Sequence, residues 1–116
     1  MAIQISGTTV IDNTRNLINA GRIYTTVSNN QTTSKTLGNR EFVSVTTAGL
    51  TMTLPASPAA GWEVAIQVGN FTNTVVSPGA GIRIMGQTLG ESMTIDVANV
   101  TVTLIYTDAT RGWRVV

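Results

Sequence analysis

Beyond residue 40, apolar and polar side chains alternate at every second position over much of the chain. A two-residue period is typical of β-strands that bury one face, and it favours antiparallel pairing. Shorter alternating stretches occur at 43–45, 50–54, 82–84, 93–95 and 113–115. The two longest stretches place four apolar residues each on one face: Trp62, Val64, Ile66 and Val68, and Val100, Val102, Leu104 and Tyr106. With the turn residues between them, these stretches predict about eight strands in residues 41–116.

The first 40 residues lack this pattern. Their scattered apolar residues suffice for extended pieces around 3–5, 8–11 and 22–27, without a closed core. Residues 25–39 are nearly all small and polar, a composition typical of loops and linkers. We therefore expect an extended N-terminal arm over residues 1–40. Residues 41–116 are expected to form an antiparallel, jelly-roll-like β-sandwich, with an intertwined trimeric β-prism as the alternative.

Composition supports an all-β protein and adds an expectation about assembly. The 116 residues are rich in Thr and Val, and only 11% are charged. A chain of this length buries a thin core, and without Cys no disulfide reinforces it. Association between subunits is the expected source of further stability. The charge is divided unevenly, with a net of +3 in residues 1–40 and −2 in residues 41–116.

Catalytic chemistry finds little support in these residues. Without His and Cys, the sequence excludes Ser–His–Asp and Cys–His catalysis and the usual zinc sites. The acidic residues of the second part are spread singly along predicted strands and turns, without calcium-loop spacing: Glu41, Glu63, Glu91, Asp96 and Asp108. Asp96 and Asp108 stand where Asx side chains commonly stabilise turns. We expect no enzyme, no cofactor and no metal site.

Partners other than proteins are also not indicated. Four spaced cations and the single aromatic Tyr24 make the arm a poor nucleic-acid site. No long apolar run predicts a membrane span, and the first residues do not resemble a secretory signal, so we expect synthesis in the cytoplasm. Trp62 and Trp113 are candidates for stacking a ligand. A Trp that alternates with Val115 in a terminal strand is, however, more often a core residue.

Two regions resemble a known group of proteins. Residues 5–17, from Ile5-Ser6-Gly7 to Arg15-Asn16-Leu17, resemble a segment of tail-fibre and other virion proteins of tailed phages, particularly those of cyanobacteria and marine bacteria. Residues 100–116, preceded by 50–55 and 61–64, resemble the terminal β-module of the same proteins. The resemblance implies a virion structural protein, usually a homotrimer.

The fibres of that group have long repeated shafts, which this chain lacks. The resemblance, together with the short length, therefore favours a capsid decoration (cement) protein on the virion surface that stabilises the head lattice. The alternative is a short tail-fibre or head-fibre module that binds a host receptor or glycan. We expect the arm to bind the major capsid protein or a neighbouring trimer subunit, so deleting residues 1–38 should abolish capsid binding and leave a folded domain. The expected contact residues are Ile3, Ile5, Val10, Ile11, Arg15, Leu17, Ile18 and Arg22.

Overall fold

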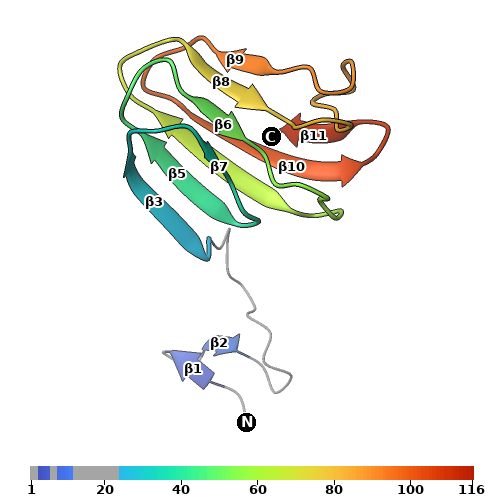
Figure 1. Cartoon of the computed structure of the whole chain (residues 1–116). Helices are drawn as coiled ribbons and strands as arrows, with labels where there is room; N and C mark the ends of the chain where they lie inside the picture. The colour runs from blue at the N-terminus through green and yellow to red at the C-terminus, as the bar shows by residue number, and fades with distance from the viewer. Residues whose placement is uncertain (1–2, 6–7, 12–23) are drawn as a thin grey trace.

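Two β-sheets packed face to face form the protein, and a computed structural model describes residues 3–5, 8–11 and 24–116 (Figure 1). The five-stranded sheet has the order β11-β10-β7-β5-β3, with bounds Gly112–Val115, Thr101–Asp108, Glu63–Val68, Glu41–Val45 and Thr26–Gln31. The four-stranded sheet has the order β4-β6-β8-β9, with bounds Lys35–Thr36, Thr51–Thr53, Thr74–Ser77 and Met93–Ile95. Two further strands, β1 (Ile3–Ile5) and β2 (Thr8–Ile11), pair with each other in an antiparallel sheet of their own. The predicted all-β sandwich is confirmed.

The chain winds between the two sheets before it turns back. Strands β3, β5 and β7 lie side by side in one sheet, and β4, β6 and β8 lie side by side in the other, all in parallel. We call each successive pair (β3–β4, β5–β6 and β7–β8) a coil. Strands β9 and β10 then run antiparallel to β8 and β7, and β11 pairs antiparallel with β10.

Strand direction thus differs from the expectation for much of the sandwich. Antiparallel pairing holds at β7–β10, β10–β11 and β8–β9, whereas the three coils are parallel, an order that an antiparallel jelly roll does not have. The reason is physical: side-chain alternation reports which face of a strand is buried and carries no information on the direction of its neighbour.

The core lies between the sheets and follows the predicted alternation. Val64, Ile66 and Val68 of β7 are buried against Met52 and Val76 of the facing sheet. The strand β7 also buries Ala65, although the alternation with Val64 and Ile66 puts this residue on the outer face. Its register partners there are Phe42 on β5 and Thr103 on β10, whose larger side chains flank it.

The boundary at residue 40 is corrected by β3 and β4. Both strands belong to the sandwich, and Leu37 is buried in its core, so residues 24–40 are not part of an arm. Polar residues were expected to leave this segment outside the core. They form strands here because backbone hydrogen bonds to β5 and β6 need no apolar side chain; among the described residues, β3 pairs with β5 alone and β4 with β6 alone. With the corrected boundary, residues 24–116 carry equal numbers of cations and acids, and residues 1–23 a net of +1.

A long connection between β8 and β9 covers the last strand of the larger sheet. Ile84 forms a parallel bridge with Trp113, and the Met85 N–H donates to the Trp113 carbonyl oxygen at 2.7 Å. The Trp113 N–H donates to the Arg83 carbonyl oxygen at 2.9 Å. Just before it, Gly112 has a φ of 70°, in the left-handed region that favours glycine. This contact seals the core around Trp113, which is fully buried.

Candidate functional site

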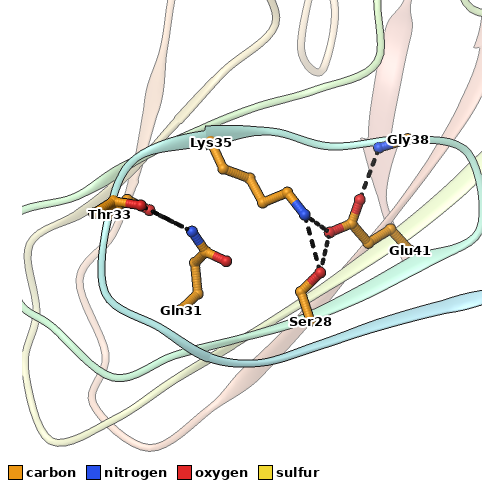
Figure 2. A network of polar contacts seen from close by, with 6 residues as sticks. All are labelled: Ser28, Gln31, Thr33, Lys35, Gly38 and Glu41. Atoms are coloured by element: carbon orange, nitrogen blue, oxygen red, sulfur yellow. Dashed lines mark hydrogen bonds and ion pairs between the residues drawn. The ribbon is translucent and has the colours of Figure 1, made fainter.

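The two ends of the stacked strands differ in chemistry. At the β3–β4 end, a polar network fills the space inside the coil (Figure 2). Lys35 Nζ lies 2.7 Å from Glu41 Oε2 and donates also to Ser28 Oγ at 3.0 Å. Ser28 Oγ donates to the same carboxylate oxygen at 2.6 Å, and the Gly38 N–H donates to Glu41 Oε1 at 3.0 Å. Polar side chains therefore close this end, as the terminal units of stacked-repeat proteins do.

Glu41 is the buried charge at the centre of this network. Burial raises the pKa of its carboxyl, but the hydrogen bonds from Lys35, Ser28 and the Gly38 N–H, together with the Lys35 charge, lower it by more. The net effect is a lowered pKa, so the group is a carboxylate at neutral pH. All of its close partners are donors that stabilise the charge, which gives Glu41 a structural role in this end of the sandwich.

The opposite end is apolar and open. The five-stranded sheet extends one strand further than its partner, so among the described strands none faces β11 beyond the β9 edge. A groove of about 240 Å³ lies there. Val115 and Val97 are 42% and 56% exposed on its walls. The remaining lining residues come from β9, β10 and the turn between them: Met93, Thr94, Ile95, Asp96, Val100 and Val102.

A larger cavity, of about 560 Å³, lies where β4 and β6 end and where the chain leaves β8. The loops at 54–58 and 78–82 form its rim, and Tyr106 of β10 reaches it from the larger sheet. Tyr106 was assigned to the core by its alternation with Leu104, because periodicity cannot show that a strand end opens onto loops. It is half-buried and lines the cavity.

The two tryptophans occupy different environments. Trp113 is fully buried and packs edge-to-face against Tyr106, with ring centroids 5.6 Å apart and an interplanar angle of 66°. Its proposed role in stacking a ligand is therefore wrong, because both ring faces are inside the core. Trp62 is half-buried and packs against the core cluster.

The predicted contact residues of the arm fall into two groups. Ile3 and Ile5 lie on β1, and Val10 and Ile11 lie on β2. Four others lie outside the described residues: Arg15, Leu17, Ile18 and Arg22.

The remaining carboxylates include two that stabilise turns. Asp108 Oδ1 accepts a hydrogen bond from the Arg111 N–H at 2.7 Å, as its position in the sequence predicted. Glu91 Oε2 accepts one from the Thr88 N–H at 3.2 Å. Within residues 3–5, 8–11 and 24–116, no three acidic side chains come together in a way that could hold a metal ion. The same part of the chain contains no helix able to cross a membrane.

Comparison with known proteins adds no relative. No protein-family model matches the chain, and no curated protein is significantly similar to it. The functional argument therefore rests on the chain's own residues and on the geometry of the two ends.

Proposed function

We propose that the chain is a virion structural protein, a capsid decoration protein that assembles as a homotrimer and binds the head lattice of a tailed phage. The phage-like segments at 5–17 and 100–116 support the virion assignment. The difference between the two ends of the sandwich supports assembly. A polar network closes one end, whereas the other presents an apolar groove.

The open end is the surface that a neighbouring subunit covers in this proposal. Burying the exposed valines of a concave apolar groove lowers the free energy of the assembled state by about 25 cal/mol per Å² of apolar surface removed from water. The edge of β9 also offers backbone N–H and C=O groups that a neighbouring chain can pair with. A contact between the open end of one copy and a different surface of the next is heterologous, and a threefold rotation closes such contacts into a ring.

Attachment to the capsid is assigned to residues 1–23. The chain enters the sandwich at Tyr24, beside β3, and β3 is the strand farthest from β11 in the larger sheet. The point of attachment at Tyr24 is therefore at the closed end, and the proposal assigns the open end to the neighbouring subunit. Their strands β1 and β2 form a two-stranded sheet, which on its own is marginally stable and gains from a partner surface.

The assembly is tested by a charge placed in the groove. We expect the purified protein to have three times the 12.2 kDa chain mass in multi-angle light scattering. Val115→Asp should give a folded monomer, because a carboxylate in the interface loses its hydration without a counter-charge. The control is Val27→Asp, at a valine 57% exposed on β3 at the closed end, which should remain a trimer. A monomeric wild type, or a Val115→Asp variant that remains trimeric, would contradict the proposal.

Capsid attachment is tested by two truncations. Removing residues 1–23 should abolish co-sedimentation with capsids and leave the sandwich folded. The longer truncation, of residues 1–38, deletes β3, β4 and Lys35, and it leaves the Glu41 carboxylate without its cation. The deletion also removes the buried Leu37 and uncovers the edges of β5 and β6, so this variant should be strongly destabilised, contrary to the sequence-based expectation. Undiminished capsid binding by the shorter truncation refutes the assignment.

A further inference from the structure

The smaller sheet is one strand short at the open end. It has four strands against five in the larger sheet, and among the described strands β9 pairs with β8 alone (Figure 1). The connection between β8 and β9 covers β11 at Trp113, where Ile84 forms its bridge. Val115, further along β11, is 42% exposed and lines the groove together with β9. The groove is therefore the place where one more short strand would complete the smaller sheet.

The residues around the groove determine which strand would fit there. Along β9, Ile95 is buried and Met93 packs against the core, whereas Thr94 between them is exposed. A strand beside β9 continues these two faces, because side chains alternate along every strand of a sheet. Among the lining residues, Asp96 alone is charged, and it is exposed in the turn after β9. The groove thus suits a short, uncharged strand with two apolar residues on either side of a polar one.

The chain contains one strand of this kind outside the sandwich. Strand β1 has the sequence Ile3-Gln4-Ile5, and its three residues equal the length of β9. It pairs with β2 and belongs to neither sheet of the sandwich. The sequence of β2, Thr-Thr-Val-Ile, offers only one apolar residue at alternate positions, so β1 is the better match. Residues 3–11 carry no charged side chain.

We propose that β1 of a second copy of this chain adds to the edge of β9 and fills the groove. The inference rests on the proposed homotrimer and names the surface of the neighbouring copy that covers the open end. With Gln4 beside Thr94, the two isoleucines of β1 lie beside the inward-facing residues of β9 in either strand direction, and they cover Val115. Strand addition of this kind combines backbone hydrogen bonds along a sheet edge with burial of alternate side chains.

The length of the chain permits this exchange between neighbours. Residues 12–23 join β2 to Tyr24. A fully extended chain of this length reaches about 40 Å, at about 3.3 Å for each residue. The larger sheet spans about 19 Å from β3 to β11, as four strand spacings of about 4.8 Å. Strand β1 can therefore reach the open end of a neighbouring sandwich, and β2 and residues 12–23 stay available for the proposed capsid contact.

Matched substitutions in β1 test the contact in the full-length protein. Ile5→Asp places a carboxylate in the apolar groove, so the mass in multi-angle light scattering should fall from three chains to one. Gln4→Asp adds the same charge at the outward position of the same strand, and this variant should remain a trimer. Both changes lie outside the sandwich, so both variants should keep the far-UV circular dichroism of the wild type.

A disulfide identifies the copy that supplies the strand. The chain has no Cys, so Gln4→Cys combined with Thr94→Cys introduces a single pair of thiols. With oxidised glutathione, we expect this variant to form covalent dimers and trimers on a non-reducing denaturing gel. The control combines Gln4→Cys with Thr101→Cys, at an exposed threonine of β10 in the larger sheet, and should form few such products.

Three results would overturn the proposal. They are an Ile5→Asp variant that remains a trimer, a disulfide formed within one chain, which would show that β1 fills its own groove, and cross-linking no greater than in the control. If any of these accompanies a trimeric wild type that Val115→Asp dissociates, the proposed assembly stands and the added strand alone is refuted. A monomeric wild type refutes the assembly and, with it, this inference.

Discussion

A single methyl group at position 112 should destabilise the protein far more than the same change at another glycine with a similar backbone conformation. Gly112 has a φ of 70°, and Gly81 has a φ of 78°. A Cβ at Gly112 would overlap the Arg83 carbonyl oxygen and lie 2.6 Å from the carbonyl carbon. A Cβ at Gly81 would meet nothing within 4 Å. The comparison of the two alanine variants therefore separates steric overlap from backbone strain.

The magnitude follows from the contacts around Trp113. Both alanine substitutions cost about 1–2 kcal/mol, because an L-residue is held in the left-handed region. In Gly112→Ala the Arg83 carbonyl must also move away, which breaks the hydrogen bond from the Trp113 N–H and strains the one between Met85 and Trp113. Two backbone hydrogen bonds contribute about 1 kcal/mol each. We expect a total loss of about 3–4 kcal/mol, against about 1–2 kcal/mol for Gly81→Ala.

The assay is urea unfolding at neutral pH, followed by tryptophan fluorescence. Trp113 is fully buried, so its emission reports exposure of the core directly. A domain of this size has about 5–15 kcal/mol of stability, which leaves both variants folded enough for a transition to be measured. If the free energies of unfolding of the two variants agree within about 0.5 kcal/mol, the close approach of Gly112 to Arg83 contributes nothing beyond the backbone conformation, and the reasoning is refuted.

Three further outcomes are expected. The pKa of Glu41 is lowered in the folded protein, so its carboxylate contributes its full stabilisation above the ordinary pKa of 4.5 and loses it as the pH falls below that value. The difference in unfolding free energy between the wild type and Glu41→Gln, measured by urea unfolding, should therefore shrink as the pH is lowered. Thr74 is fully buried with a hydroxyl that has no hydrogen-bond partner, so Thr74→Val should raise the unfolding free energy by about 1–2 kcal/mol; a loss of stability would show that the hydroxyl is satisfied. Met52→Ala should cost about 2–5 kcal/mol because Met52 is fully buried, whereas Met85→Ala, at a side chain 48% exposed, should cost much less; equal losses in thermal unfolding would contradict the assigned core.

The sequence predicts which residues are buried more reliably than which strands are neighbours. The alternation of Val64, Ile66 and Val68 correctly identifies the inner face of β7, because burial of one face requires a period of two. The same alternation would be produced by a parallel or an antiparallel partner. Parallel coils depend on contacts between residues far apart along the chain, such as Val43 with Ile66, and no local pattern encodes these contacts.

The extended piece predicted around 22–27 overlaps only the start of β3, and the rest of the strand was taken for a linker because its residues have little apolar character of their own. Its segment resembles a linker in composition, yet it pairs with β5 through backbone hydrogen bonds that any sequence can make. The sequence offered one signal for this segment: the apolar Leu37 lies between Lys35 and Glu41, two residues of opposite charge six positions apart that form an ion pair in the structure. Composition alone does not show that Leu37 and Glu41 are buried.

The candidate site was only partly predictable. Trp113 was proposed both as a ligand platform and as a core residue, and the structure supports the core. Tyr106 lines the cavity because the loops at 54–58 and 78–82 converge on it, an arrangement that depends on the ends of three strands in the other sheet. The apolar groove likewise arises from unequal numbers of strands in the two sheets, which becomes visible only when the topology is known.

The coils give the chain a simple way to change its dimensions in evolution. Within each sheet the middle coil, β5–β6, pairs only with the coil before it and the coil after it, so duplication of that coil would add one strand to each sheet and leave both ends as they are. The protein would lengthen by the spacing of neighbouring strands, about 4.8 Å, for each added coil. Related chains of different length could therefore keep the same polar network at the β3–β4 end and the same β10–β11 pair, and span different distances on a surface.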